Sequence, residues 1–191
     1  MPTRKILTYG HPTLRKKTAP IQRVSEDIRK LISDMIQTME ENMGLGLAAP
    51  QIGDLHRVIV ASVEEQTYVL INPKITKRSR EKEIALEGCL SLPRLYADVE
   101  RHQRITVTAK SRAGKSISLE AKDMLARVLQ HEIDHLAGVL ITDKYVDNSL
   151  RWMVSSMNDE GEETLDLLQT TIQEVENHFR TQRAKKVIPS P

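Results

Sequence analysis

Two helical patterns separated by short strand-like segments constrain the fold of this chain most. Residues 25–44, SEDIRKLISDMIQTMEENMG, repeat apolar side chains at helical spacing, and Ser25 is placed to cap the helix. Residues 122–137, KDMLARVLQHEIDHLA, form a second such pattern, which ends before Gly138. Four segments between them read as strands: 57–63, 67–73, 104–110 and 115–121. Without βαβ alternation, this order predicts an α+β fold with short antiparallel or mixed sheets packed around the second helix.

The C-terminal part of the chain differs in composition. Residues 162–183 fit a third helix whose apolar seam is narrow: Leu165, Leu168, Ile172, Val175 and Phe179. We therefore expect one domain over residues 1–150, followed by a C-terminal helical extension over 151–191. The basic tail of that extension is expected to be disordered.

Composition excludes several classes of protein. The chain has 39% hydrophobic and 28% charged residues, as in an ordinary globular protein, and its net charge of +2 does not by itself indicate nucleic-acid binding. No apolar run approaches the roughly 18 residues of a membrane span. The N-terminus, MPTRKILTYGHP, lacks the apolar core of a signal peptide. With one cysteine, the default location is a reducing cytoplasm, or an organelle if a transit peptide has been removed.

The most informative stretch is QHEIDHLAG, residues 130–138. His131 and His135 are four residues apart, so on a helix they project from one face and can bind one divalent cation. Glu132 can then lie beside the open coordination position as a general base. Asp134 points elsewhere on the helix, and it suits a salt bridge or a hydrogen bond to a ligand residue better than direct coordination. The alternative is a pair of surface histidines on an amphipathic helix.

A catalytic metal site usually has three protein ligands and a water. Downstream of the two histidines the chain offers Asp143 and more distant glutamates, without a further histidine motif. Upstream lies Cys89, the single cysteine, within EGCLSLP at 87–93. A thiolate with two imidazoles suits a soft or borderline divalent metal. The alternative for Cys89 is a small apolar core residue.

Three stretches together resemble the signature motifs of the peptide deformylase family. They are GLGLAAPQ at 44–51, EGCLS at 87–91 and QHEIDH at 130–135, in that order. Supporting similarity runs from the N-terminal arm to about residue 146. The resemblance implies that residues 1–150 form a deformylase catalytic domain built around the HExxH helix.

The resemblance also implies a metal centre. Its ligands would be Cys89, His131 and His135, and Glu132 would be the general acid and base. The metal of this family is typically ferrous iron, with zinc, nickel or cobalt as alternatives. A hydroxide formed on the metal would attack the carbonyl carbon of the substrate's formyl group.

The substrate implied by the resemblance is the N-formyl-methionine that begins newly made bacterial and organellar polypeptides. Gln51 and the backbone N–H of Leu90 would donate hydrogen bonds to the oxygen of the attacked formyl group. Gly46 would line the cleft and pair with the substrate backbone. Because Pro50 disfavours helix at Ala49, we expect the stretch 44–51 to be extended, so that a substrate can add to it as a strand.

For other side chains near these motifs, the sequence allows more than one role. Met124, Val128 and Leu45 could form the wall of an apolar pocket for the substrate's Met side chain, or could belong to the core. Arg127 is expected at the pocket rim with its charge in solvent. Arg101 is a candidate contact for the substrate's backbone or carboxylate.

Two rival functions remain open from the residues alone. A metallopeptidase would need a third ligand downstream. A binding module without catalysis would be expected to lack Glu132 or Gln51, and both are present.

The cations near the C-terminus also leave alternatives. Arg180, Arg183, Lys185 and Lys186 fit a solvated helix end, or a contact with ribosomal RNA at the ribosome. The narrow apolar seam leaves dimerisation open.

Overall fold

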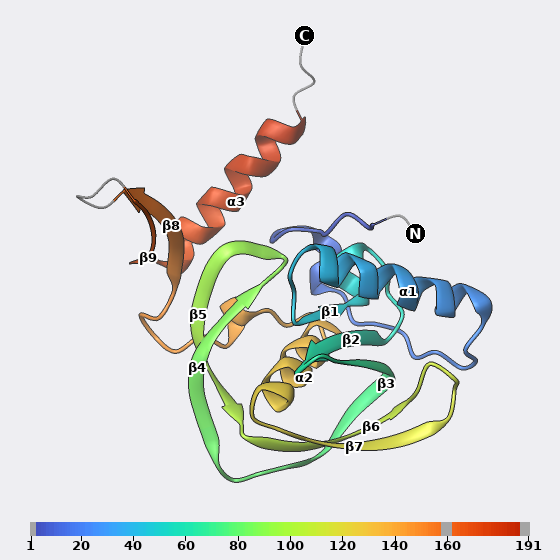
Figure 1. The fold of residues 1–191 in the computed structure, drawn as a ribbon. Coiled ribbons are helices and arrows are strands. Elements are labelled where there is room, and N and C mark those ends of the chain that lie inside the picture. The colour runs from blue at the N-terminus through green and yellow to red at the C-terminus, as the bar shows by residue number, and fades with distance from the viewer. Residues whose placement is uncertain (1–2, 158–161, 188–191) are drawn as a thin grey trace. The chain divides into compact units, whose positions relative to one another are not determined.

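The computed structural model describes residues 3–157 and 162–187, which fold into two units. The first is built mainly from His11–Glu83 and Arg101–Leu140, and the second from Thr8–Gly10, Ile84–Glu100 and the described residues from Ile141 onward. Figure 1 shows the three helices: α1 (Glu26–Glu41), α2 (Asp123–His135) and α3 (Ile172–Val187). Short 3-10 turns are η1 (Pro12–Arg15), η2 (Ala49–Ile52) and η3 (Ile141–Asp143). None of the helices described is long and apolar enough to cross a membrane.

The first unit contains a five-stranded antiparallel sheet in the order β1-β2-β3-β6-β7. Its strands are β1 (Gly46–Ala48), β2 (Val58–Val63), β3 (Gln66–Arg78), β6 (Arg104–Lys110) and β7 (Ser116–Lys122). Alternate residues of β6, namely Ile105, Val107 and Ala109, join the core with Leu129 of α2. The residues between them in sequence face away from this core. The four predicted strands are confirmed, and β1 lies within the stretch 44–51 that was expected to be extended.

Helix α1 follows the predicted pattern closely. The Oγ of Ser25 accepts a hydrogen bond from the N–H of Ile28 at 3.4 Å, so the predicted N-cap is confirmed. The buried apolar residues are Ile28, Leu31, Ile32, Met35 and Met39. The helix stops at Glu41, earlier than predicted, because Met43 adopts a left-handed conformation with φ of 52°.

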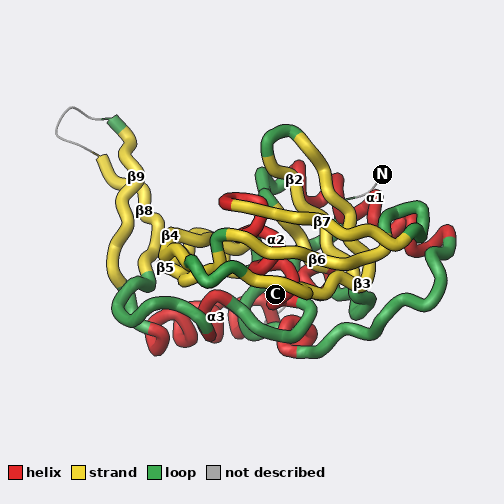
Figure 2. Tube along the Cα trace, turned by 90° about the horizontal axis from the view of Figure 1, so that it is seen from below, coloured by secondary structure: helices red, strands yellow, loops and turns green. Residues whose placement is uncertain are grey.

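The second unit contains a sheet in the order β4-β5-β8-β9. These strands are β4 (Lys82–Cys89), β5 (Leu92–His102), β8 (Arg151–Met157) and β9 (Glu163–Gln169). Figure 2 shows β8 and β9 running side by side as an antiparallel pair. A core cluster joins this sheet to α3 through Leu92, Leu95, Ala97, Val99, Val175 and Phe179.

The prediction of one helix over residues 162–183 is wrong for its first part. Residues 163–169 form β9, which pairs with β8 in a register that places Trp152 opposite Leu168 and Ser155 opposite Leu165. Backbone hydrogen bonds to a distant strand therefore override a seam that local spacing made look helical.

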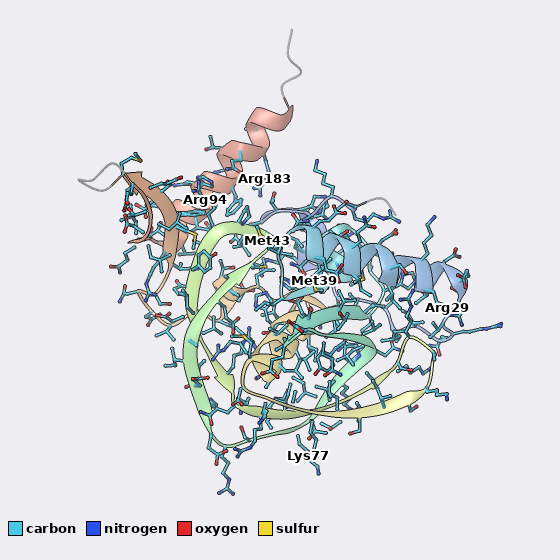
Figure 3. All side chains as sticks on the ribbon, viewed as in Figure 1. Arg29, Met39, Met43, Lys77, Arg94 and Arg183 are labelled. Atoms are coloured by element: carbon cyan, nitrogen blue, oxygen red, sulfur yellow. The ribbon has the colours of Figure 1, made fainter. Side chains whose placement is uncertain are left out.

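The C-terminal helix itself begins at Ile172 and continues to Val187, beyond the predicted end (Figure 3 labels Arg183 on it). The predicted disorder of the tail is wrong as far as Val187. Its remainder, 188–191, lies outside the described residues. The α+β class, with three helices and two antiparallel sheets, is confirmed. The predicted boundary between residues 150 and 151 stays a prediction.

Candidate functional site

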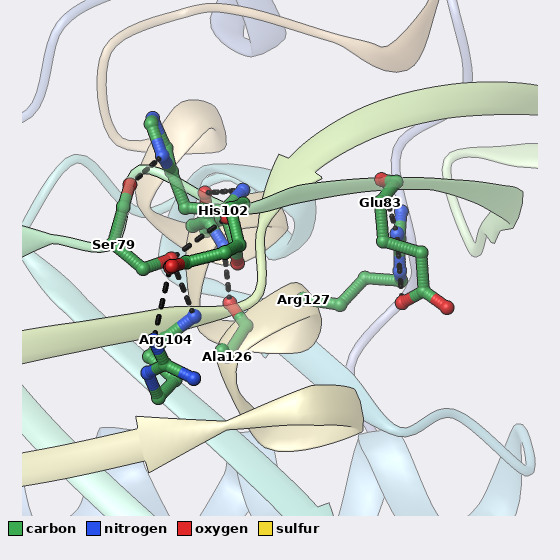
Figure 4. A network of polar contacts seen from close by, with 8 residues as sticks. Ser79, Glu83, His102, Arg104, Ala126 and Arg127 are labelled. Atoms are coloured by element: carbon green, nitrogen blue, oxygen red, sulfur yellow. Dashed lines mark hydrogen bonds and ion pairs between the residues drawn. The ribbon is translucent and has the colours of Figure 1, made fainter.

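Helix α2 is fixed in place by polar side chains that bond to backbone. The side-chain oxygen of Gln130 accepts a hydrogen bond from the N–H of His102 at 3.2 Å. Its amide nitrogen donates to the carbonyls of His102 and Ala126, both at 2.9 Å (Figure 4). A side chain that bonds a neighbouring segment through both ends of its amide sets the rotation of the helix about its axis. Sequence reasoning assigned Gln130 no role, because nothing in the local sequence marks its contact with His102.

Arg127 does not lie at a solvated rim, and that prediction is wrong. Its side chain is buried, and its guanidinium donates to the carbonyl oxygen of Glu83 at 2.9 Å (Figure 4). The Glu83 carboxylate lies 3.8 Å from it. A buried cation needs such partners because removing it from water is costly.

Asp134 makes a salt bridge, as predicted. Its partner is Arg101, whose side chain is only 4% exposed and donates to the Asp134 carboxylate. This pairing holds the far side of α2 and leaves the suggested contact of Arg101 with substrate without support.

His131 and His135 lie on one face of α2, as their spacing predicts. Both side chains are buried, and their ring centroids are 5.0 Å apart with the planes inclined at 70°. Two imidazoles this close, on one rigid helix, are placed to share a cation.

Glu132 lies against the backbone of β1. The side chain is buried, and a Cβ added at Gly46 would lie 2.8 Å from the Cδ of Glu132 and still closer to its Oε1. Any side chain at position 46 would therefore displace the carboxylate. Gly46 thus has a packing reason to be glycine, which sequence reasoning missed because the two residues lie far apart in the chain.

Gln51 is held by its own turn. The predicted extended path through Ala49 is wrong: β1 ends at Ala48 and residues Ala49–Ile52 form η2, where Pro50 occupies one of the first two helical positions. Proline is favoured at the start of a helical turn because its φ is already suitable. The turn folds Gln51 back so that its Oε1 accepts a hydrogen bond from the Ala48 N–H at 2.7 Å. With the oxygen engaged there, Nε2 is the donor end of this buried amide.

The second unit carries the remaining site residues at a strand end. Cys89 is the last residue of β4 and is partly buried, and Leu90 and Ser91 form the turn into β5. Ser91 is fully buried, and its carbonyl accepts a hydrogen bond from the N–H of Tyr9 at 2.8 Å.

Cys89, His131 and His135 form a group of potential metal ligands. The thiol sulfur and the ring nitrogens lie within 4.8 Å of one another, and no other such group occurs in residues 3–157 and 162–187. One thiolate and two imidazoles fit a soft or borderline divalent ion and leave a position open for water or substrate. The donor set therefore fits the metal that the resemblance implies.

The three predicted pocket residues differ in exposure. Leu45 and Met124 are 51% and 50% exposed, so both side chains are accessible to a ligand. Val128 is buried within the core of the first unit, in line with the alternative given for it. A substrate pocket at these residues stays a prediction.

Comparison with known proteins identifies the family of this chain. A family model described as polypeptide deformylase matches residues 3–151. A peptide deformylase of Dictyoglomus thermophilum is 43% identical over 148 residues, covering 78% of this chain and 96% of the relative.

Two solved structures are similar as well. A Synechococcus elongatus peptide deformylase in complex with actinonin has a TM-score of 0.75 and 40% identity, covering 77% of this chain and 81% of its own. A peptide deformylase from Ehrlichia chaffeensis, 29% identical, has a TM-score of 0.77 and covers 100% of both chains. From the match over residues 3–151 and a relative at 43% identity, the chain belongs to the polypeptide deformylase family of metal-dependent hydrolases.

Proposed function

We propose that this enzyme removes the formyl group from the N-terminal formyl-methionine of newly synthesised polypeptides and releases formate. Membership of the family supports the reaction class. The observation that carries the proposal is the buried Glu132, which lies between the two histidines in sequence and against Gly46 of an edge strand in space. A carboxylate in that position can transfer a proton beside a peptide bound at the strand edge.

The proposed metal ligands are Cys89, His131 and His135, with ferrous iron as the expected metal and zinc, nickel or cobalt as alternatives. A divalent cation held there would act as a Lewis acid, lowering the pKa of water and polarising a carbonyl oxygen. The two histidines can bind a metal without movement of α2, because Gln130 and Arg127 fix the helix from its flanks.

Glu132 is the proposed general acid and base. Its carboxylate would take a proton from the attacking water as a bond forms between the water oxygen and the formyl carbon. It would then deliver that proton to the amine nitrogen as the C–N bond breaks, which yields formate and a free N-terminal Met. The close packing against Gly46 limits movement of the carboxylate on that side, which favours a small reorganisation during the reaction.

Gln51 and the backbone N–H of Leu90 are the proposed donors to the oxygen that becomes negatively charged. The hydrogen bond from Ala48 holds Oε1 of Gln51, and this orients the amide with Nε2 as donor. One fixed donor of this kind is worth about 2.7–4 kcal/mol in a comparable oxyanion site.

The substrate is proposed to add to β1 as a further strand. β1 is at the edge of its sheet, and Gly46 is the first of its three residues. Backbone hydrogen bonds to an edge strand bind a peptide without regard to its side chains. Leu45, Met124 and Val128 are the proposed contacts for the first side chain, Met.

The proposal is tested by formate release. Protein purified without oxygen, with its metal content measured, is assayed on a formyl-Met tripeptide as wild type, as Glu132→Gln, and as Glu120→Gln. Glu120 is an exposed carboxylate on β7 and serves as the matched control. We expect wild type and Glu120→Gln to release formate at the same rate, and Glu132→Gln to lose about 10²–10⁴-fold in kcat while keeping its metal.

Two results would contradict the proposal. One is wild-type protein with one metal per chain that releases no formate. The other is cleavage of an internal peptide bond by the same preparation, which would favour the metallopeptidase reading instead.

Contact with the ribosome is a further part of the proposal, together with a location in the bacterial cytoplasm or an organelle. The basic residues of α3 would bind RNA phosphates, and such binding weakens steeply with salt. Arg183 already donates to the carbonyl of Tyr9 at 2.7 Å, so Arg180, Lys185 and Lys186 are the cations that this proposal uses.

A further inference from the structure

The C-terminal helix contacts the short segment Thr8–Gly10 along one line. Val175 and Phe179 are fully buried, and the next position on the same stripe, one turn further, is Arg183. The guanidinium of Arg183 donates to the carbonyl oxygen of Tyr9 at 2.7 Å. It also occupies the space where a Cβ of Gly10 would lie, and Gly10 has a φ of +88°. Arg183 therefore continues the buried stripe as a polar anchor for the segment.

The ring of Tyr9 is part of the same contact. Its centroid lies 5.4 Å from that of Phe179, and Phe179 in turn lies 6.0 Å from Trp152. Cys89 packs partly buried against this cluster, together with Tyr9 and Trp152. Thus α3 and the Cys89 side chain share one packed apolar cluster within the second unit.

The backbone of Tyr9 connects this anchor to the turn that follows Cys89. While its carbonyl accepts from Arg183, its N–H donates to the carbonyl of Ser91 at 2.8 Å. Ser91 directly follows Leu90, whose N–H is a proposed oxyanion donor. The direction of that N–H depends on the geometry of a two-residue turn, and the turn is held from one side by Tyr9.

We propose that Arg183 and Tyr9 are positioning residues for the Cys89–Leu90–Ser91 turn, so that α3 contributes to catalysis although it touches none of the reacting atoms. The inference rests on the proposed function. It assigns a role to a helix that lies beyond the residues 3–151 matched by the family model. A displaced donor costs rate rather than binding, because the oxyanion exists only in the transition state.

The test compares Arg183→Met with Gln182→Met in the full-length, metal-loaded enzyme. Gln182 is also an exposed polar residue of α3, and its side chain bonds within the helix to His178, so Gln182→Met is the matched control. We expect Arg183→Met to lower kcat about tenfold with KM unchanged, since small displacements of catalytic groups carry penalties of up to about 10². Arg183→Lys keeps a donor and should recover most of the rate. Gln182→Met should match wild type.

Hydrogen exchange in the same holoenzymes provides a readout that does not depend on activity. The Tyr9 N–H and the amides of residues 89–91 should exchange several-fold faster in Arg183→Met than in Gln182→Met. If Arg183→Met does not fold, Phe179→Leu replaces it, because that change removes the ring contact with Tyr9 and keeps an apolar side chain.

A variant that melts at a lower temperature but keeps wild-type kcat, KM and exchange at residues 89–91 would overturn the inference, leaving α3 a purely structural element. A rise in KM alone would overturn it as well. If wild type releases no formate, the proposed function fails, while the exchange data still decide whether the anchor holds the turn.

Discussion

Helices α2 and α3 differ in how many of their residues are buried and in whether polar residues are among them. In α2, every residue from Ala126 to Glu132 is buried, and the polar ones among them are Arg127, Gln130, His131 and Glu132. In α3, only Val175 and Phe179 are fully buried among the residues whose side chains are described, and the polar residues face solvent. Burying polar groups is costly unless each is bonded, so α2 requires partners from several strands. The difference predicts where substitutions will affect activity and where they will affect stability.

The largest expected effect lies in the salt bridge behind α2. Arg101→Met removes the guanidinium partner of the Asp134 carboxylate, whose side chain is 20% exposed. Breaking a buried pair typically costs about 3–5 kcal/mol, and we expect a loss at the lower end of that range. The control is Arg104→Met, which breaks a pair with Glu81 whose side chains are 62% and 58% exposed. Such surface pairs contribute about 0–1 kcal/mol. Urea denaturation of the two variants measures both values, and equal losses would contradict the distinction.

The second prediction concerns the packing of Glu132. Gly46→Ala places a methyl group 2.8 Å from the Cδ of Glu132, so the buried carboxylate must shift. We expect kcat for formate release to fall about 10²-fold, the loss associated with misplacing a catalytic group by about 1 Å. Metal content and melting temperature, measured in the same preparations, serve as controls. Unchanged kcat would show that the carboxylate adapts without loss.

The third prediction concerns a buried side chain of α3. Val175→Ala removes two methyl groups from a fully buried site, and we expect a loss of about 1–3 kcal/mol in unfolding free energy. The neighbouring Glu176 is exposed, and Glu176→Ala should change stability by less than about 0.5 kcal/mol. Thermal denaturation followed by circular dichroism distinguishes the two.

The smallest effect is expected at the start of α3, where Glu174 forms a capping box. Its carboxylate accepts from the Thr170 hydroxyl at 2.8 Å and from the Thr171 N–H at 3.0 Å, and the Thr171 hydroxyl accepts from the Glu174 N–H at 3.3 Å. These bonds hold the pKa of Glu174 below its ordinary value of 4.5, and the bond from the Thr170 hydroxyl lowers the pKa most. The stabilisation is therefore present above pH 4.5 and is lost as the pH falls through the lowered pKa.

Hydrogen exchange at Thr171 between neutral and acidic pH checks this. Wild type should lose protection of this amide as Glu174 becomes protonated, and Glu174→Gln should lose that pH dependence. Glu176→Gln should behave as wild type. A wild-type profile in Glu174→Gln would assign the effect to another group.

The comparison of the helices also explains what the sequence could predict. The spacing of His131 and His135, with Glu132 between them, depends only on helical geometry, so one face of α2 could be predicted from local sequence. The packing of Gly46 against Glu132 joins residues far apart in the chain, and nothing local marks it. Arg127 looked like a rim residue because its partner, the backbone carbonyl of Glu83, carries no signature in sequence.

The helix prediction for the C-terminal region was wrong for a related reason. Leu165 and Leu168 continue the helical spacing of Ile172 and Val175, yet their segment pairs with β8. A short apolar pattern fits either a helix or a strand, and only the pairing partner decides between them. β4 and β5 were likewise missed, since charged residues interrupt both segments: Lys82, Glu83 and Glu87 in one, Arg94 and Glu100 in the other.

The position of Trp152 gives the protein a built-in optical probe. It is the only tryptophan in the chain, and its ring centroid lies 4.7 Å from His178 and 6.0 Å from Phe179, both on α3. Tryptophan emission therefore reports whether α3 is docked, whereas far-ultraviolet circular dichroism reports the helices and strands of both units. Coincident unfolding curves from the two signals would mean that the units unfold together. An earlier fluorescence transition would mean that α3 detaches while α2 is still folded.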